Sequence, residues 1–466
     1  MMSDLATIAR LDATAQAALV ATGELSEHEL WQHCQERIAR LNPLLRAVRH
    51  VVDAPEPARA GPLRGVPFLL KDSSPWPGLP WTLGSRLFAR RVTSQQTDYG
   101  RRLVEAGLVL AGKTALSEVG LLASTESLLD GVTHNPWRLD LSPLGSSGGS
   151  AVAVAAGLVP LAHANDGGGS IRAPASACGL FGFKPSRGRT AVANRSGTDF
   201  ADMTSEHCIS RSVRDSALFL ALTEDDAHGS LGFVSEPSAE RLRIGSWTAT
   251  LTGQSPDADV LAAHEDAVAL LQELGHHVQP VAAPRYEPAL AEAYYVVAAA
   301  AVAGMVETID RTRREPVQSV ELEPFTWSLL ELLEVRGSDA VPHARATFQR
   351  AIAHYREVTA PFDVILTPTL GCAPPPIGTL SPVLPRELLL ARTASLLAYT
   401  PIHNIVGSPA MSVPLHWSQQ GLPIGVHFAA APGRDATLLR LAYELERARP
   451  WSDRFPPYSV PALYEA

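Results

Sequence analysis

Short apolar runs alternate with helical segments along most of this 466-residue chain. The runs that read as buried strands are GVPFLLK (65–71), LVLAGK (108–113), LVPLAHA (158–164), FDVILTPT (362–369) and PIGVHFAAA (423–431). The segments with helical periodicity include YGRRLVEAG (99–107), SAVAVAAG (150–157) and DATLLRLAYELERA (435–448). Strands that alternate with helices form a sheet covered on both faces. We therefore predict the α/β class, with a central mixed, mostly parallel twisted sheet.

The two regions that depart from this alternation are the N-terminus and residues 285–360. Residues 25–41 predict a helix that begins with a Ser26/Glu29 capping box and is stopped by Asn42-Pro43. We expect residues 1–60 to pack on one large domain, 61–466, as a helical segment. Residues 285–360 are rich in Ala, Glu, Leu and aromatics and predict a helical insertion. Its aromatics, such as Tyr294, Tyr295, Phe325 and Trp327, are expected in the core, with some of them lining a substrate pocket.

Composition narrows the partners that we expect. The formal net charge is −9 and no basic block occurs, which argues against a nucleic-acid partner. No apolar run reaches the ~18 residues of a membrane span, and MMSDLATIAR does not have the pattern of a secretory signal. The four cysteines form no CxxC and no metal-site spacing. We expect reduced core thiols, no metal, no membrane contact and a cytoplasmic location.

Lysine is rare in this chain. Of the 39 basic residues, only Lys71, Lys113 and Lys184 are lysines. Arginine stays protonated at ordinary pH, whereas a desolvated lysine can lose its proton. A lysine in this chain is therefore expected to do something that arginine cannot, and Lys71 ends the apolar run VPFLL.

Two serine-bearing glycine loops, GSSGGS (145–150) and DGGGS (166–170), lie downstream. The first matches G-x-S-x-G around Ser147, but HNPWRLDLSPL before it is a poor strand for a nucleophile elbow. A phosphate cradle is disfavoured because neither GxxxxGK[ST] nor GxGxxG is present. The glycines could simply form tight turns between packed elements. The occurrence of two serine-bearing glycine loops together with Lys71 argues against that interpretation.

These segments resemble those of the amidase signature enzymes. The resemblance is dense over about 62–190, including GPLRGVPFLLKD, SPLGSSGGSAVAVAAG and HANDGGGSIRAP, and it returns at 362–450 with GLPIGVHFAAAPG. It implies the amidase signature fold and a catalytic triad of Lys71, Ser146 after a cis peptide bond, and the nucleophile Ser170. No cofactor is implied.

The resemblance also suggests roles for the neighbours of the triad. Backbone amides of the glycine loop, from Gly167, Gly168 and Gly169 to Ser170, are expected to form an oxyanion hole. Three further residues are expected to support the loops: Ser147, Asp166 and Arg172. The expected substrate contacts are Ser124, Leu144 and Ile424.

Two departures from the family pattern refine the expectation. Leu144 replaces the first glycine of P-G-G-S-S-G-G, which would alter the backbone angles of the loop or narrow the pocket. The loop reads N-D-G-G-G-S where many members read T-D-x-G-G-S. With NPWRLD and PAMSVPLHW, this variant looks most like the branch that contains 6-aminohexanoate-cyclic-dimer hydrolase and urethanases.

We therefore expect a serine amidohydrolase that acts on small apolar amides or carbamates. One alternative is the amidase subunit of a glutamine-dependent tRNA amidotransferase, against which the NDGGG loop and the PLHW segment argue. Another is a catalytically silent pseudo-amidase, which the complete triad disfavours. The expected partners are a small-molecule substrate and, among proteins, a second copy of the chain.

Overall fold

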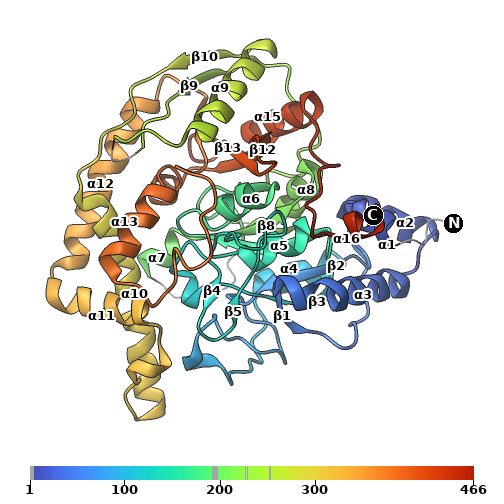
Figure 1. Cartoon of the computed structure of the whole chain (residues 1–466), viewed down its shortest axis with the longest axis horizontal. Helices are drawn as coiled ribbons and strands as arrows, with labels where there is room; N and C mark the ends of the chain where they lie inside the picture. The colour runs from blue at the N-terminus through green and yellow to red at the C-terminus, as the bar shows by residue number, and fades with distance from the viewer. Residues whose placement is uncertain (1–4, 192–197, 226, 228, 251–252, 466) are drawn as a thin grey trace.

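The computed structural model describes residues 5–191, 198–225, 227, 229–250 and 253–465. Within these residues, eleven strands form one sheet through the middle of the molecule, with helices on both of its faces (Figure 1). In sheet order the strands are β1 (Val48–Val51), β3 (Val109–Thr114), β2 (Pro67–Lys71), β6 (Leu161–Asp166), β8 (Ser205–Ser210), β7 (Phe181–Lys184), β12 (Ala410–Trp417), β13 (Pro423–Ala429), β11 (Val364–Pro368), β9 (Arg243–Ser246) and β10 (His277–Pro280). A separate short ribbon pairs β4 (Glu126–Ser127) with β5 (Gly131–Val132). The predicted α/β class with a central mixed sheet is confirmed.

The pairing within the sheet corrects one detail of that prediction. Parallel pairs occur only in β3–β2–β6 and in β11–β9–β10, and the other six of the ten pairings are antiparallel. The sheet is therefore mixed but not mostly parallel. The sequence SEHCIS of β8 contains no apolar run, yet all six residues are buried between β6 and β7, antiparallel to both. The hairpin of β12 and β13 is also antiparallel, as are the pairings of these two strands with β7 and β11.

The helices cover the sheet and extend beyond it. They are α1 (Leu5–Arg10), α2 (Ala13–Thr22), α3 (Glu27–Leu45), α4 (Asp98–Glu105), α5 (Gly148–Ala155), α6 (Arg172–Cys178), α7 (Asp199–Asp202), α8 (Val213–Thr223), α9 (Ala258–Glu273), α10 (Ala289–Arg313), α11 (Pro324–Arg336), α12 (Ala340–Thr359), α13 (Arg386–Leu396), α14 (Pro401–Val406), α15 (Asp435–Ala448) and α16 (Val460–Glu465). The capping box of α3 is present, but the helix continues through Pro43. Proline removes one helical hydrogen bond, and the burial of Leu45 holds the last turn in place.

The N-terminal segment contributes more than helices. Besides α1, α2 and α3, it supplies β1, which pairs with β3 at the edge of the sheet. Helix α1 packs against α16, so the two ends of the described chain lie close together (Figure 1). The segment predicted to pack on the domain is thus continuous with its sheet.

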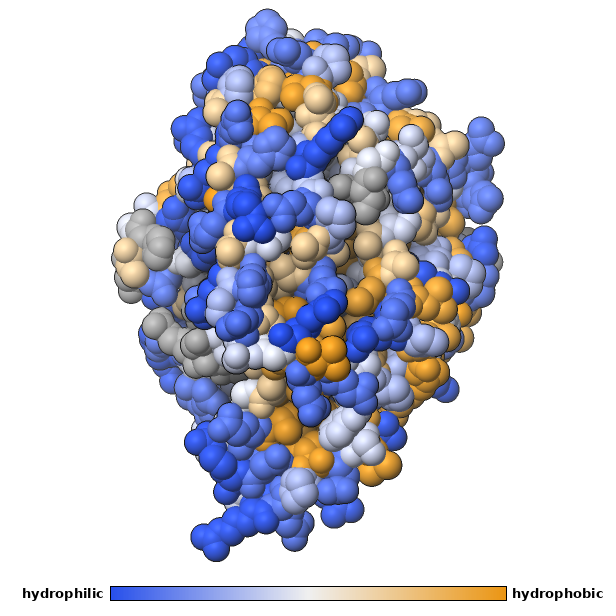
Figure 2. Space-filling view, turned by 90° about the vertical axis from the view of Figure 1, so that its left-hand side faces the viewer, coloured by the Kyte–Doolittle hydropathy of each residue, from blue (hydrophilic) through white to orange (hydrophobic). Residues whose placement is uncertain are grey.

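Residues 285–360 form the predicted helical layer, with α10 packed on α11 and α12 at one side of the molecule (Figure 1). The outer face of this side shows small apolar groups separated by polar residues (Figure 2). Among the described helices, only α10 is long and apolar enough to cross a membrane. A core helix meets the same criterion, and residues such as Val297 and Ala299 of α10 are buried in the cluster shared with Phe325 and Leu329.

Strands β2 and β6 and helix α5 meet at one edge of the sheet. Strands β2 and β6 are parallel neighbours, so their carboxyl ends, Lys71 and Asp166, lie on the same side of the sheet. In open α/β sheets, ligands bind beyond the carboxyl ends of the strands. Helix α5 passes behind this edge, and all eight of its residues are buried. Its small side chains permit the approach: a Cβ on Gly149 would lie 2.6 Å from the backbone nitrogen of Ala115.

Candidate active site

A cavity of about 580 Å³ opens at this edge. Its walls are largely apolar and come from the loop 119–123, from α7, from α10, and from α13 and α14. They include Leu121, Leu122, Phe200, Leu290, Tyr294, Tyr295, Leu397, Ile402 and Ile405. Ser146, Ser170, Gly167 and Gly168 also line it. Among the described lining residues the charged ones are Arg285 and Glu287, and both are exposed. The cavity therefore combines an apolar interior with one polar wall.

Lys71 lies behind that polar wall. Its Nζ is 2.8 Å from Ser146 Oγ and 2.6 Å from Asn165 Oδ1. The side chain is fully buried. Burial lowers the pKa of Lys71 to about 7, although the negative charges of Glu206 and Asp166 oppose the shift. A substantial fraction of this amine is therefore neutral near pH 7 and can accept a proton.

The other two lysines are also buried, but they make different contacts. Lys113 forms an ion pair with Asp72 and donates to Pro80 O, and Lys184 donates to Pro185 O. Among the described contacts of the three lysines, only those of Lys71 include a serine hydroxyl.

Ser146 and Ser170 complete a polar chain from Lys71 to the cavity. The peptide bond Gly145–Ser146 is cis, as the resemblance implied. Ser146 lies in the loop before α5, and its backbone N–H donates to Ser170 Oγ at 3.0 Å. Ser170 follows the glycine loop between β6 and α6 and is only partly buried. This arrangement connects a hydroxyl that reaches the cavity, through a second serine, to a partly neutral amine.

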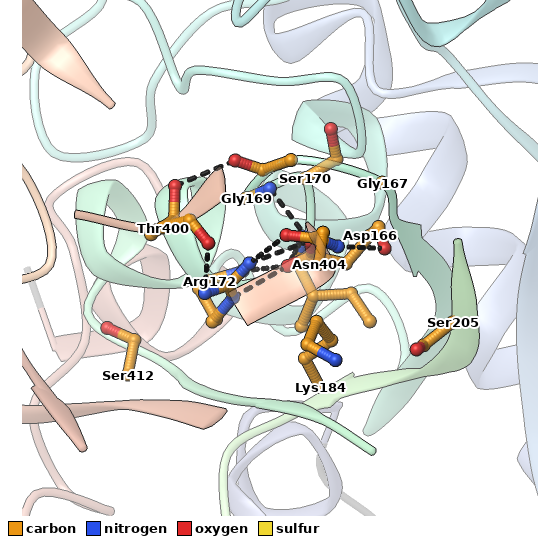
Figure 3. A network of polar contacts seen from close by, with 12 residues as sticks. Asp166, Gly167, Gly169, Ser170, Arg172, Lys184, Ser205, Thr400, Asn404 and Ser412 are labelled. Atoms are coloured by element: carbon orange, nitrogen blue, oxygen red, sulfur yellow. Dashed lines mark hydrogen bonds and ion pairs between the residues drawn. The ribbon is translucent and has the colours of Figure 1, made fainter. Parts of the chain in front are cut away.

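The glycine loop differs from the expectation at one residue. Gly169 N donates to Asp166 Oδ1 at 2.7 Å, so this N–H group points into the protein and cannot serve an oxyanion (Figure 3). The φ of Gly169 is +136°, a conformation open to glycine, and it allows this inward turn. Among the described residues, no acceptor is found for the N–H groups of Gly167, Gly168 and Ser170. The predicted oxyanion hole thus loses Gly169 and keeps these three donors as candidates.

Asp166 and Arg172 form a buried network below the loop, and the Ser170 hydroxyl points away from it (Figure 3). Arg172 Nε and Nη2 each lie 2.9 Å from a different Asp166 oxygen, and Nη2 also donates to Asn404 Oδ1. Asp166 additionally accepts from the backbone N–H of Ile171. Burial alone would raise the pKa of Asp166, but Arg172, Lys184 and Asn404 outweigh burial and hold this pKa well below its usual range. The carboxylate is therefore charged, and it fixes both ends of the glycine loop.

The remaining predicted site residues lie at varying distances from the cavity. Ser147 Oγ donates to Asn165 O at 3.2 Å and thereby links the two serine loops. The structure does not bring Ser124, Leu144 or Ile424 to the described cavity wall. Ser124 Oγ donates to Leu380 O, and Leu144 and Ile424 are buried in two different apolar clusters. The expectation that these three contact substrate thus stays a prediction, with no support from the described cavity wall.

Leu144 instead shows how the chain accommodates its departure from glycine. Its φ is +61°, in the left-handed region that favours glycine. The side chain is fully buried. The leucine therefore keeps a glycine-like backbone and adds apolar packing beneath the serine loop.

Three residues make contacts at the site that were not predicted from the sequence, although Tyr294 was expected as a core or pocket-wall aromatic. Asn165 holds Lys71 Nζ through Oδ1 and donates through Nδ2 to Ser73 Oγ at 2.9 Å. Tyr294 and Thr400 donate to carbonyls of the glycine loop. The N-D variant of the loop was the available signal for Asn165. No local pattern marks Tyr294 or Thr400, because each meets the loop from more than 120 positions further along the chain.

Metal and thiol chemistry have few candidate groups. In the described part of the chain, no cluster of three or more His, Cys, Asp or Glu side chains could hold a metal ion. The four cysteines are free thiols, and three of them are buried.

Comparisons with known proteins agree with this geometry. Residues 32–439 match the family model described as Amidase. Putative amidase AmiC of Mycobacterium leprae (strain TN) is 35% identical, with 95% of this chain and 96% of that protein covered. The 6-aminohexanoate-cyclic-dimer hydrolase of Paenarthrobacter ureafaciens is 33% identical, with 96% of each covered.

Solved structures show the same similarity. A structure of 6-aminohexanoate cyclic dimer hydrolase complexed with substrate superimposes with a TM-score of 0.89 at 32% identity, covering 97% of this chain and 99% of that one. A bacterial aryl acylamidase of the amidase signature family superimposes with a TM-score of 0.83 at 25% identity, covering 97% and 98%. Fold and sequence are thus similar to those of proteins named for amide hydrolysis.

Proposed function

The chain belongs to the amidase family and is an amide-hydrolysing enzyme; from this premise we propose that it is a serine amidohydrolase that works through an acyl-enzyme on Ser170. The observation that carries the proposal is the chain of contacts from Lys71 Nζ to Ser146 Oγ at 2.8 Å and from Ser146 N to Ser170 Oγ at 3.0 Å. It ends at an apolar cavity of substrate size.

In the first step, Ser170 Oγ attacks the carbonyl carbon of the substrate. A serine hydroxyl is a weak nucleophile and needs an adjacent base. We propose that Ser146 Oγ takes the proton from Ser170 Oγ and passes its own proton to the neutral amine of Lys71, to which it is hydrogen-bonded, while the Ser146 backbone N–H holds Ser170 Oγ beside it. The negative charge that develops on the carbonyl oxygen is stabilised by N–H groups of Gly167, Gly168 and Ser170, each worth roughly 3–4 kcal/mol in such sites.

In the second step, the tetrahedral intermediate collapses and the C–N bond breaks. Lys71 returns the proton through Ser146 to the leaving nitrogen, so the amine departs neutral and the acyl group stays on Ser170. Water then attacks the acyl-enzyme by the same relay, which releases a carboxylic acid and restores Ser170. A carbamate substrate would follow the same route up to the release of its alkoxycarbonyl or carbamoyl group.

The substrate class follows from the cavity walls. Aliphatic and aromatic side chains dominate the interior, and the two charged lining residues are exposed. An ionised side chain or zwitterion inside this cavity would lose hydration without a buried partner. We therefore propose small, uncharged, fairly apolar amides or carbamates. The cyclic-dimer hydrolase and the aryl acylamidase to which the chain is similar are named for amide substrates of this kind.

The test is a hydrolysis panel that contains an anilide, the cyclic dimer of 6-aminohexanoate, an aryl carbamate, glutamine and asparagine. We expect cleavage of at least one of the first three, abolished in Ser170→Ala and in Lys71→Ala, with thermal unfolding of both variants unchanged. A fluorophosphonate should add its mass to the peptide that contains Ser170 in the wild type and not in Ser170→Ala. Full activity in either variant would refute the assignment, and exclusive cleavage of glutamine or asparagine would refute the substrate class.

A further inference from the structure

In the glycine loop, the carbonyl groups of the four residues 166–169 are all held by hydrogen bonds. Four donors contact four consecutive carbonyls: Asn404 Nδ2 to Asp166 O at 2.8 Å, Tyr294 Oη to Gly167 O at 2.9 Å, Thr400 Oγ1 to Gly168 O at 2.7 Å, and Ala173 N to Gly169 O at 2.7 Å. Two of the donors, Tyr294 and Thr400, are side-chain hydroxyls from α10 and from the start of α14. The direction of each peptide plane in the loop is therefore fixed from outside the loop.

Holding a carbonyl also orients the next N–H group. In a trans peptide the C=O of one residue and the N–H of the next lie in one plane and point in opposite directions. The hydroxyl of Tyr294 on Gly167 O therefore sets the direction of Gly168 N–H. Glycine has little steric preference between alternative backbone conformations, so an unheld Gly–Gly peptide can turn over easily. In this loop the bond from Tyr294 removes that freedom.

Tyr294 is tightly seated where it makes this contact. A Cβ on Gly168 would lie 2.4 Å from the Tyr294 oxygen, so the hydroxyl rests directly on the face of that glycine. The ring is held edge-on by Phe200 at 5.9 Å and by Tyr295 at 5.5 Å between ring centroids. The same ring lines the cavity. One side chain thus connects the helical layer, the substrate cavity and the glycine loop.

We propose that Tyr294 is a positioning residue that holds the Gly168 N–H group toward the oxyanion, and that Thr400 holds the neighbouring peptide plane. The inference rests on the proposed function, since it assigns a role within the same site. Thr400 keeps Gly168 O away from the cavity, and the opposite end of that plane, Gly169 N–H, meets Asp166. Figure 3 shows Thr400 and Asp166 on the side of the loop away from the Ser170 hydroxyl.

A positioning role predicts a particular kinetic signature. The oxyanion exists only in the transition state and in the tetrahedral intermediates, so a misdirected N–H group lowers kcat and leaves substrate binding nearly unchanged. Removal of an oxyanion donor outright costs about 100-fold to 1,000-fold in kcat. Loss of the bond that orients the donor should cost less, roughly 10-fold.

The test compares Tyr294→Phe with Tyr399→Phe. Tyr399 also donates its hydroxyl to a backbone carbonyl, Thr248 O, but it does not line the cavity that contains Ser170. We expect Tyr294→Phe to lower kcat for the best panel substrate about 10-fold with KM within 2-fold, and Tyr399→Phe to change neither. The affinity for an aryl trifluoromethyl ketone, whose adduct with Ser170 carries an oxyanion, should fall by the same factor as kcat/KM.

At Thr400 a conservative substitution can test whether the hydroxyl itself is what matters. Thr400→Val removes the hydroxyl and should lower kcat, whereas Thr400→Ser keeps it and should retain kcat. The inference is overturned if Tyr294→Phe loses no more kcat than Tyr399→Phe, if its loss is entirely in KM, or if the ketone binds it as tightly as the wild type. In each of these cases an active wild type and an inactive Ser170→Ala would leave the proposed function standing. A wild type that cleaves nothing in the panel and takes up no fluorophosphonate would refute both.

Discussion

The contact between Asn165 and Lys71 offers a direct way to change the strength of the proposed base. Asn165 Oδ1 lies 2.6 Å from Lys71 Nζ, and an amide oxygen there accepts a hydrogen bond without adding charge. Asn165→Asp is nearly isosteric and would place a carboxylate at the same distance. An opposite charge so close favours the protonated amine and typically raises a pKa by about 1 to 3. The pKa of Lys71 should therefore rise from about 7 to roughly 8–10.

The size of the effect on activity follows from the neutral fraction of Lys71. With a pKa of about 7, half of the amine is neutral at pH 7. With a pKa of roughly 8 to 10, the neutral fraction at pH 7 falls to about 9% or about 0.1%. Because the proposed base acts only when neutral, kcat/KM at pH 7 should fall about 5-fold to 500-fold. The loss should shrink as pH rises, since the amine deprotonates in the variant as well.

The assay is kcat/KM for the best panel substrate between pH 5.5 and 9.5. In the wild type we expect activity to rise through about pH 7 and then level off; in Asn165→Asp the rise should move to higher pH. Asn165→Ala is the matched control, because it removes the hydrogen bond without adding a charge. An Asn165→Asp profile that is lowered uniformly, with its acid limb where the wild type has it, would contradict the role of Lys71 as the base.

The remaining predictions concern stability and are measured by urea unfolding. Gly145→Ala should destabilise the fold by at least ~2–3 kcal/mol, since its Cβ would lie 2.1 Å from Ser124 O, a backbone atom that cannot easily move; an unchanged midpoint would contradict the packing described. Leu144→Gly relieves a positive φ worth ~1–2 kcal/mol but loses a buried side chain worth ~2–5 kcal/mol, so the net change should be destabilising, and a stabilised variant would show that backbone strain dominates. Asp166→Asn leaves the buried Arg172 without its counter-charge and should cost ~3–5 kcal/mol, whereas a loss below about 1 kcal/mol would indicate that the remaining partners of Arg172 suffice.

Much of the fold could be predicted because local patterns determine it. The predicted apolar runs overlap β2, β3, β6 and β11, with ends that differ by up to three residues, and the segment 435–448 is a helix over its full predicted length. Pairing direction is different, because it depends on which strands meet. Strand β8 is polar in sequence and buried in the sheet, so its insertion between β6 and β7 could not be read from periodicity.

In the candidate site, too, the features set by local motifs could be predicted, and those set by distant contacts could not. Lys71, Ser146 and Ser170 were proposed together from the resemblance, and the structure brings them into one chain of contacts. The direction of a single N–H group is not a property of a motif. Gly169 was grouped with its neighbours in the sequence, yet its amide turns inward to Asp166 because a side chain competes for it. The residues of the cavity wall were harder to predict, because the wall is assembled from helices distant in sequence. Ser124 and Ile424, which were expected to contact substrate, pack elsewhere in the protein.

The burial of all three lysines has a practical consequence for the chemistry of the outer surface. Lys71, Lys113 and Lys184 are each at most 1% exposed, and the chain contains no other lysine. Acylating reagents directed at ε-amines, such as succinimidyl esters, should therefore find none of them accessible in the folded protein and all three after unfolding. Labelling of lysine would therefore measure unfolding and would not modify the folded enzyme. Site-directed attachment to a support or a dye could then be designed by placing one new lysine on the surface, free of competition from native side chains.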